Sequence, residues 1–375
     1  MDFSYSEEQQ MLQSSVSKFV QQDYDFHRRC KLVSSDTGFS LENWRLFAEL
    51  GWLMVPFNEQ DGGLGGSAVD LMVLMEEFGR GLVVEPFLAT AVLSGGLIAD
   101  SASEAQKREL LGLLMEGQLQ LAFAFAESQS RYNLADITTN AKKEGDAYIL
   151  NGHKAVVLNA EAADKLLVTV RTSGVQYDRE GVTLLMVDAD SEGVSRQCYR
   201  TVDGHRAAEV KFKNVKVPEA NRIGVEGTAL PAIEKSIDRA TLALCAEAVG
   251  AMEKIYKKTV EYTKTREQFG VAIGKFQALQ HRMVDMFTEY EQARSILLMA
   301  VLQWDSNKGA APKAVSAAKS RIGKAARLIG QEAIQIHGGI GVTEELDVSH
   351  FFKRLTTIQY LFGSTDFHTL RFAEH

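Results

Sequence analysis

The stretch from Leu230 to Arg266 constrains the fold more than any other part of the sequence, because it predicts a single very long helix. It contains no proline after Pro231, and its apolar residues recur three and four positions apart. At 1.5 Å per residue, such a helix would run roughly 50 Å. Helices this long need partners of similar length, which Lys275–Gln303 and Ala311–Ile336 would provide. We therefore expect a four-helix bundle within a C-terminal domain over residues 227–375.

The first part of the chain also predicts helices. Apolar residues follow helical spacing in Asp2–Gln21, Leu41–Leu50, Ser67–Arg80 and Ser103–Glu116. The glycine-rich run Gly62–Gly66 indicates a loop between the second and the third of these stretches, because glycine at that density cannot hold a helix. We expect an N-terminal helical domain over residues 1–118.

The middle of the chain changes to a β pattern. Short β-rich runs are separated by turn residues, and they comprise Gln118–Ala126, Tyr148–Leu150, Val156–Leu158, Leu166–Val170, Val182–Val187 and Ala208–Phe212. Asn151-Gly152, a pair typical of hairpin turns, separates the second run from the third. We expect a β-barrel or β-sandwich domain over residues 119–226. The fold class predicted for the whole chain is α+β, in the order helical, β, helical.

The composition narrows the classes of function. The net charge is −8 over 375 residues and no basic tract occurs, so a nucleic-acid partner is not expected. Cys30, Cys198 and Cys245 lie far apart without a C-x-x-C pair, which argues against a disulfide framework and against a metal site. The polar start predicts no signal peptide, and the longest near-apolar run, Phe87–Ala99, is too short for a membrane span. We expect a cytoplasmic protein.

Two segments near the C-terminus share a pattern that suits a dinucleotide. The first reads Arg266-Glu267-Gln268-Phe269-Gly270 and is followed by Gln277, and the second reads Gln335-Ile336-His337-Gly338-Gly339-Ile340-Gly341. A glycine pair lets backbone N–H groups approach a pyrophosphate, and an arginine neutralises its charge. The structural alternative is that Arg266 caps a helix end and Gly338-Gly339 is only a turn.

These segments, with Glu345 after the second, resemble the signature of the acyl-CoA dehydrogenases. The middle block resembles the same family, with Glu127, Asn151-Gly152, Lys154 and Asn159 in the expected order. The resemblance covers essentially the whole chain. The stretches HGGIGVTEEL and KRLTTIQYLFGSTDFHTLRFAE look most like a bacterial subgroup, the small subunit of pimeloyl-CoA dehydrogenase and its relatives, which pair with a second chain of the family.

The resemblance implies an oxidoreductase that carries FAD. In the family the flavin lies at a contact between subunits, and its adenosine diphosphate part is held by groups of the neighbouring chain. By position these groups are Arg266, Gln268, Phe269, Gln277, Gln335, Gly338 and Gly339. The implied reaction is α,β-dehydrogenation of an acyl-CoA thioester to a 2-enoyl-CoA, in fatty acid metabolism and lipid degradation. The implied partners are an electron-transfer flavoprotein, as electron acceptor, and further chains in a homo- or heterotetramer.

The sequence departs from the family where the chemistry would take place. The family's usual catalytic base is a glutamate in a Tyr-Glu-Gly-Thr segment, and the matching stretch here carries Phe362. A second base position of the family falls at Ala240, which is not a carboxylate either. In the β domain, Arg131-Tyr132 replaces a glycine-serine pair, and Val156 and Leu158 replace a tryptophan and a threonine that contact the flavin ring.

Glu247 is the carboxylate that we predict to be the catalytic base. It lies in the stretch Ala240–Met252, where only Thr241 is also polar, and its neighbours at i±3 and i±4 offer no ion-pair partner. A carboxylate buried away from cations has a raised pKa, which suits proton abstraction. The structural alternative is a glutamate that faces solvent or pairs with an arginine of another helix.

Two further functions remain compatible with the sequence. One is a non-catalytic subunit that lends Arg266 and Gln335–Gly339 to the FAD of a partner chain. The other is an acyl-CoA oxidase or a flavin monooxygenase on the same scaffold. A set of basic residues on one helix predicts either a solvated face or a contact with CoA phosphates, and it comprises Lys319, Arg321, Lys324 and Arg327.

Overall fold

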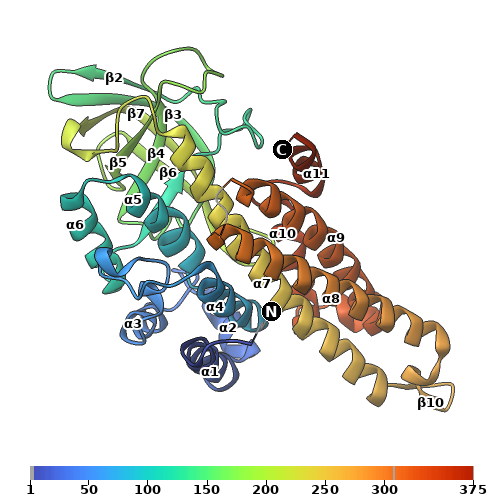
Figure 1. Cartoon of the computed structure of the whole chain (residues 1–375). Coiled ribbons are helices and arrows are strands. Elements are labelled where there is room, and N and C mark those ends of the chain that lie inside the picture. The colour runs from blue at the N-terminus through green and yellow to red at the C-terminus, as the bar shows by residue number, and fades with distance from the viewer. Residues whose placement is uncertain (1–3, 307–308, 375) are drawn as a thin grey trace. The chain divides into compact units, whose positions relative to one another are not determined.

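The computed structural model describes residues 4–306 and 309–374 of the chain (Figure 1). They fold into two compact units, each assembled from separate stretches. The helical unit comprises Met1–Lys31, Ser67–Val83 and Thr241–His375, and the sheet unit comprises Leu32–Gly66 and Val84–Ala240. The predicted order of helices, β-strands and helices along the chain is confirmed. The division into three continuous domains stays a prediction.

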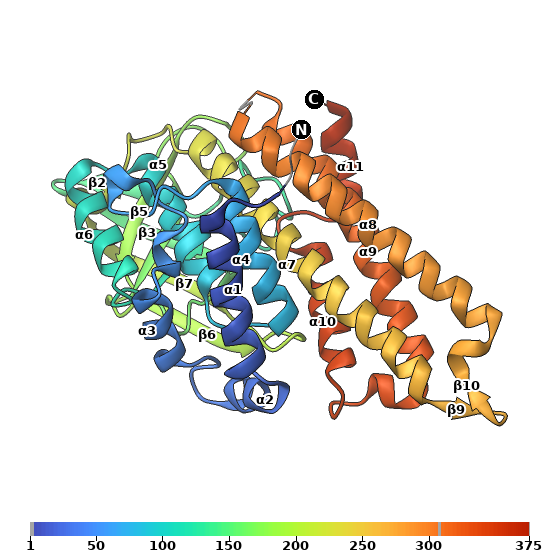
Figure 2. The ribbon, with the colours of Figure 1, turned by 60° about the horizontal axis from the view of Figure 1, so that its bottom comes forward.

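Three long helices form the frame of the helical unit. They are α7 (Leu230–Thr265, whose first residues belong to the sheet unit), α8 (Gln277–Ser306) and α9 (Ala311–His337). Both ribbon views show them running side by side (Figures 1 and 2). α10 (Asp347–Tyr360) and α11 (Thr365–Glu374) pack against α9, and α1 (Glu7–Gln22) packs against α4 (Ala68–Gly81). The long helices expected from the spacing of apolar residues are therefore present.

α7 and α4 cross with their backbones in direct contact. A Cβ added at Gly79 would lie 2.0 Å from the carbonyl oxygen of Glu247, and one added at Gly250 would lie 1.9 Å from that of Glu76. Every residue of α7 from Ala240 to Met252 is buried, as expected for a helix that is apolar on all sides. The two glycines fix the position of Glu247 relative to α4.

The sheet unit contains, within the described residues, one eight-stranded sheet in the order β6-β7-β3-β2-β4-β5-β8, with β1 paired to β4. The strands are β1 (Leu121–Ala124), β2 (Asn140–Glu144), β3 (Ala147–Leu158), β4 (Lys165–Arg171), β5 (Val182–Asp188), β6 (Val194–Arg200), β7 (Arg206–Pro218) and β8 (Arg222–Ile223). Side chains such as Tyr148, Val168 and Val210 form its buried core. β6 was not predicted, because its side chains are mostly polar and half exposed.

The hairpin predicted at Asn151-Gly152 is wrong. β3 runs straight through this pair, and the turn that joins β2 to β3 lies instead at Gly145 and Asp146, with Glu144 opposite Ala147. The pairing of β3 with β7 shifts register between Leu150 and Gly152. A Cβ at Gly152 would lie 2.4 Å from the hydroxyl oxygen of Thr139. The glycine therefore serves a β-bulge with a close side-chain contact, not a turn.

Shorter elements complete the two units. In the sheet unit they are α3 (Leu41–Glu49), η1 (Trp52–Met54), η2 (Glu59–Asp61), the π-helix η3 (Leu88–Gly95), α5 (Gly96–Ser101), α6 (Glu104–Met115) and η4 (Glu219–Asn221). In the helical unit they are β9 (Glu267–Gln268), β10 (Val271–Ala272), η5 (Ile273–Lys275) and η6 (Gly338–Val342), while α2 (Phe26–Ser34) has residues in both units. Ser67 and Ser103 cap α4 and α6, close to where the sequence placed these helices.

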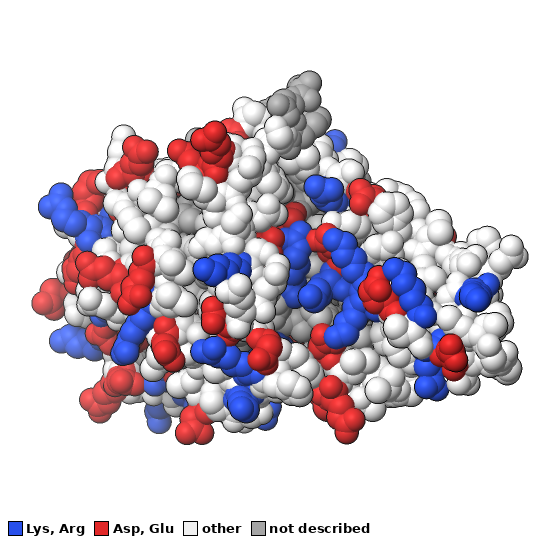
Figure 3. All heavy atoms as spheres, turned by 90° about the horizontal axis from the view of Figure 1, so that it is seen from below, with Lys and Arg blue, Asp and Glu red and all other residues white. Residues whose placement is uncertain are grey.

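The surface carries charges of both signs. On the face drawn in Figure 3, acidic and basic side chains are interspersed with uncharged surface between them, a pattern usual for a solvated surface. Among the described residues, no helix has the length and apolar character that crossing a bilayer would require.

Candidate functional site

The two segments singled out in the sequence meet at the ends of α7 and α9. The ring of Tyr262, in the last turn of α7, stacks on the ring of His337 with centroids 4.3 Å apart and an angle of 26° between their planes. The Tyr262 hydroxyl donates to the His337 carbonyl oxygen at 3.4 Å. Arg266 follows one turn later, with its N–H bonded to the Tyr262 carbonyl at 2.9 Å. Gly338 follows His337 directly, so Arg266 and the glycine pair flank one stacked contact.

Both glycines of the pair are exposed and face open space. A Cβ added at Gly338 or at Gly339 would meet no heavy atom within 4 Å. Gly338 needs to be glycine for its backbone, with φ 66° and ψ −143°, a combination that other residues rarely adopt. Gly339 has no such requirement within the chain. The bare backbone at this point is therefore available to a group from outside the chain.

Most polar side chains of the two segments have no partner within the described part of the chain. Among the residues that the structure describes, the side chains of Arg266, Gln277 and Gln335 make no hydrogen bond or ion pair, and all three are exposed. The amide of Gln268 bonds only to the neighbouring Glu267 carbonyl, at 2.7 Å. These groups can therefore bind a ligand without breaking an existing contact.

A short hairpin carries Phe269 at its tip, between β9 and β10. Its side chain is 93% exposed, and its backbone has φ 54°, the left-handed region that bulky residues seldom adopt. The ring makes an edge-to-face contact with Phe276 at 6.1 Å between centroids. A strained and exposed aromatic residue is typical of a contact surface rather than of a folding requirement.

Together these residues fit the adenosine diphosphate part of a dinucleotide. Phosphate requires a cation, bare backbone and hydrogen-bond donors, which Arg266, the glycine pair and the glutamines provide. The end of α9 carries the partial negative charge of a helix C-terminus, so a cation such as the Arg266 guanidinium is needed to make the site attractive to an anion. An exposed aromatic ring, Phe269, is suited to stacking on a base.

Glu247, the predicted base, is paired with an arginine of another helix. The Arg354 Nε–H donates to Glu247 Oε1 at 2.5 Å, and the Arg354 Nη2 group donates to Oε2 at 2.7 Å. Both side chains are buried, with 4% of each residue exposed. The premise that this carboxylate lies away from cations is therefore wrong, and the structural alternative describes its surroundings. Its role as a base stays a prediction.

The segment that carries Phe362 is held by two buried side chains. Lys319 Nζ donates to the carbonyl oxygens of Ile358 at 2.9 Å, Gln359 at 3.3 Å and Gly363 at 2.7 Å. His368 Nε2 donates to the Phe362 carbonyl at 3.1 Å, and Phe362 itself has a left-handed backbone with φ 59°. The prediction that Lys319 belongs to a basic surface face is wrong, because the sequence pattern did not show that the carbonyls at the end of α10 need a donor.

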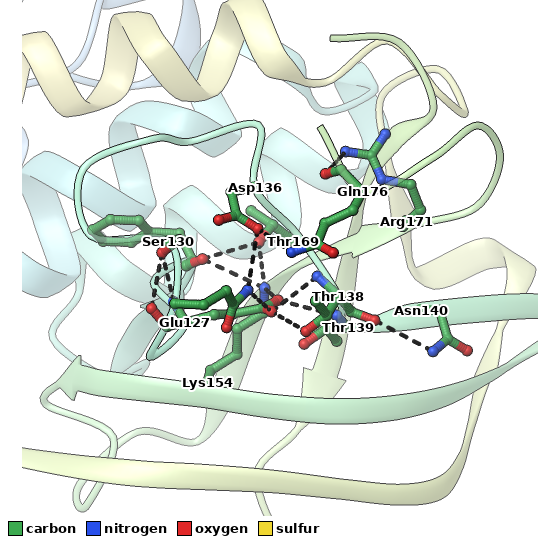
Figure 4. A network of polar contacts seen from close by, with 12 residues as sticks. Glu127, Ser130, Asp136, Thr138, Thr139, Asn140, Lys154, Thr169, Arg171 and Gln176 are labelled. Atoms are coloured by element: carbon green, nitrogen blue, oxygen red, sulfur yellow. Dashed lines mark hydrogen bonds and ion pairs between the residues drawn. The ribbon is translucent and has the colours of Figure 1, made fainter. Parts of the chain in front are cut away.

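In the sheet unit, Glu127 and Lys154 form the centre of a buried polar network (Figure 4). Lys154 Nζ donates to Glu127 Oε1 at 2.7 Å and to Thr169 Oγ1 at 2.8 Å. Glu127 Oε2 accepts from the Thr138 N–H at 2.9 Å and from the Thr138 hydroxyl. Burial raises the pKa of Glu127, but Lys154 and the hydrogen bonds outweigh it and lower that pKa to about 2. Burial lowers the pKa of Lys154 to about 8.

Two departures from the family pattern have strained backbones. Arg131 has φ 47° and Val156 has φ 52°, and for the β-branched Val156 this is a genuine outlier. The side chain of Val156 is 47% exposed, and its N–H donates to Glu209 Oε1 at 3.2 Å. It lies where β3 shifts register against β7 between Lys154 and Val157. The network around Glu127 thus supports a strained, outward-facing bulge.

The sequence did not single out three residues that organise these sites. Tyr262 is four positions before Arg266, so the two lie on the same face of α7, a signal that was present in the sequence. His337 lies within the second segment without a role predicted above, and its stack on Tyr262 joins the two segments. Arg354 offered no sequence signal, because its pairing with Glu247 depends on how α10 packs. Among the described residues, no group of His, Cys, Asp or Glu could hold a metal ion.

Comparison with known families identifies the scaffold. The domain models of the acyl-CoA dehydrogenases match residues 6–118 for the N-terminal domain, 122–215 for the middle domain and 230–375 for the C-terminal domain. The chain belongs to the acyl-CoA dehydrogenase family, a family of oxidoreductases.

Its relatives include more than one activity. The chain is 28% identical over 375 residues to a probable acyl-CoA dehydrogenase, YngJ, of Bacillus subtilis, covering 99% of this chain and 98% of the relative. It is 28% identical over 354 residues, 93% of each chain, to subunit CarC of the caffeyl-CoA reductase-Etf complex of Acetobacterium woodii. The solved FAD complex of PigA superposes with a TM-score of 0.92 at 26% identity, covering 100% of this chain and 98% of that chain.

Proposed function

We propose that the chain is a subunit of an FAD-dependent acyl-CoA dehydrogenase that converts an acyl-CoA thioester to the 2-enoyl-CoA. The observation that carries the proposal is that Tyr262 joins the exposed turn at Gly338 and Gly339 to the helix end that carries Arg266, whose exposed guanidinium has no partner among the described residues. Hydrogen-bond donors and bare backbone that contribute nothing to the folding of the chain are suited to binding a phosphate. The FAD in the solved complex of PigA supports the choice of dinucleotide.

In this function the residues at the ends of α7 and α9 hold the adenosine diphosphate part of FAD. Arg266 would neutralise the pyrophosphate, Gly338 and Gly339 would let it approach the backbone, and Phe269 would cover the adenine. When bound, FAD supplies the acceptor for the hydride that leaves the β carbon. All four residues are exposed within this chain, so the proposal places the site at a contact with a second chain of the family.

The reaction also needs a carboxylate that can take the α proton of the thioester. Both oxygens of Glu247 accept hydrogen bonds from Arg354, so the carboxylate must leave a buried ion pair before it can accept a proton. Phe362 and Ala240 cannot accept one. This supports a second candidate function, in which a partner chain supplies the base and this chain completes the partner's FAD site. Electrons would pass to an electron-transfer flavoprotein, as the name of the CarC complex suggests for that relative.

The test is the flavin content of the assembly. The chain is purified alone and with a second acyl-CoA dehydrogenase-like chain from its own source, and FAD is measured by absorbance. Arg266→Gln is expected to reduce bound FAD at least tenfold, whereas Lys264→Gln changes it little, because Lys264 is an exposed cation near the end of the same helix that pairs with Glu261. Unchanged FAD in Arg266→Gln would overturn the proposal.

A further inference from the structure

Two contacts join α7 to the connection between α9 and α10. Tyr262 stacks on His337 at the end of α9, and one turn earlier on α7, Lys258 pairs with Asp347 at the start of α10 at 2.5 Å. Between them lies the segment that contains Gly338 and Gly339. The exposed glycine turn is therefore held to α7 on both sides.

The His337 ring is fixed before it meets Tyr262. Because a carbonyl oxygen can only accept, the bond of 2.8 Å to the Ala333 carbonyl places the proton on Nδ1. His337 is buried, and burial lowers the pKa of its imidazole, with the nearby Lys258 charge acting in the same direction. The turn beyond it is closely packed, since a Cβ at Gly341 would lie 2.9 Å from the Ile334 carbonyl oxygen and 3.0 Å from His337 Cβ. The neutral ring thus offers one face to Tyr262.

We infer that Tyr262 and His337 are positioning residues for the dinucleotide, whose stacked rings set the spacing between Arg266 and the glycine turn. The inference rests on the proposed function and assigns these two residues no contact with the ligand. Arg266 is a long side chain at a helix end, and of the two contacts that tie α7 to the glycine segment, the stack is the one next to Gly338 and one turn from Arg266. Binding groups must be held to within about 0.5 Å of their working geometry to act together.

The physical consequence is specific to the adenosine diphosphate part of the ligand. If the stack is lost, Lys258 and Asp347 still tie the segment to α7, but the last turn of α7 can shift relative to the end of α9. The guanidinium and the glycine backbone then no longer reach the same pyrophosphate. Affinity for FAD should then fall. Affinity for FMN, which lacks the adenosine half, should change little, because the stack lies next to the residues proposed for that half.

The experiment measures equilibrium binding of FAD and of FMN to the flavin-free assembly. Tyr262→Leu is expected to weaken FAD at least tenfold and FMN less than twofold. Tyr262→Phe keeps the ring and loses only the long hydrogen bond of 3.4 Å to the His337 carbonyl, so it should keep FAD within about threefold, in line with the small net value of one such bond. Lys264→Leu, on the same helix but outside the contact, should behave like the wild type.

A second pair of variants keeps the test decisive if Tyr262→Leu does not fold. His337→Phe keeps an aromatic ring and should retain FAD, whereas His337→Leu should lose it at least tenfold, with the melting temperature of each variant measured in parallel. FAD affinity that is unchanged in Tyr262→Leu, or that falls together with FMN affinity, would overturn the inference. If Arg266→Gln leaves FAD affinity unchanged, the proposed function itself fails, whatever Tyr262 does.

Discussion

Glu247 of α7 and Arg354 of α10 face each other as a buried two-point ion pair, with contacts of 2.5 and 2.7 Å. The pair joins two helices of the helical unit at a point where α7 is apolar on all sides. Water does not screen charges there, so a change at the Glu247 carboxylate acts strongly on the Arg354 guanidinium. A structural role of Glu247 can therefore be measured through the stability of a variant, and a catalytic role through its turnover.

Glu247→Gln should lower the free energy of unfolding by about 1.5–3 kcal/mol, because it weakens the two buried, charge-assisted hydrogen bonds that Arg354 donates to this carboxylate. Denaturant unfolding of Glu247→Gln and of the wild type checks the prediction. A stable Glu247→Gln variant that binds FAD but has lost turnover would support the role of Glu247 as the catalytic base.

Two glycine substitutions should have opposite effects on the stability of the chain, one at the crossing of α4 and α7 and one in α6. Gly250→Ala should destabilise the chain by about 1–3 kcal/mol or more, because the added Cβ would lie 1.9 Å from the Glu76 carbonyl oxygen and backbones cannot easily move apart. Gly112→Ala, in α6, meets nothing within 4 Å and should stabilise by about 0.5–1 kcal/mol through helix propensity. Equal melting temperatures for the two variants would contradict the packing described here.

The pair of Glu127 and Lys154 predicts a pH dependence of stability. The pKa of Glu127 is lowered from 4.5 to about 2, so its contribution is fully present above its ordinary value and is lost as the pH falls toward 2. The free energy of unfolding should fall across this window by up to about 1.4 kcal/mol per pH unit from this one group. Glu127→Gln should remove that component and should also be less stable at neutral pH, where Lys154 stays buried without its partner. A wild-type slope equal to that of Glu127→Gln in this window would refute the assignment.

Lys319 and Lys324 lie on the same helix and give a matched comparison. Lys319→Met should destabilise by about 1–3 kcal/mol, because it removes the donor from three carbonyl oxygens at the end of α10. Lys324→Met should change stability by less than about 0.5 kcal/mol, because Lys324 is exposed. Hydrogen exchange of the amides from Leu361 to His368 should speed up only in the Lys319 variant. Equal exchange in both variants would show that Lys319 does not hold this segment.

The sequence predicted the long helices because periodicity over more than ten residues is a strong signal, and the structure has α7, α8 and α9 close to where they were placed. The prediction from sequence failed where one local pattern is compatible with two structures. Asn151-Gly152 suits a turn, but here Gly152 serves a bulge against Thr139. The turn lies at Gly145 instead, where glycine takes φ 63°.

The site was predictable only in part, for a similar reason. Arg266 and the glycine pair could be selected from the sequence, because their residue types alone suit a phosphate. The partners of Glu247 and Lys319 could not, because they depend on packing between helices that are distant in sequence. The sequence pattern around a buried glutamate with no cation on its own helix is the same whether the glutamate is a free base or half of an ion pair. Only the arrangement of α7 and α10 distinguishes the two.

The most direct measurement of the central claim compares Gly339→Val with the wild type for FAD affinity and for melting temperature. A side chain at Gly339 would meet nothing within 4 Å in this chain, so the variant should keep its melting temperature without ligand and should lose FAD affinity by at least tenfold. Wild-type FAD affinity in a folded Gly339→Val variant would contradict a dinucleotide site at the ends of α7 and α9.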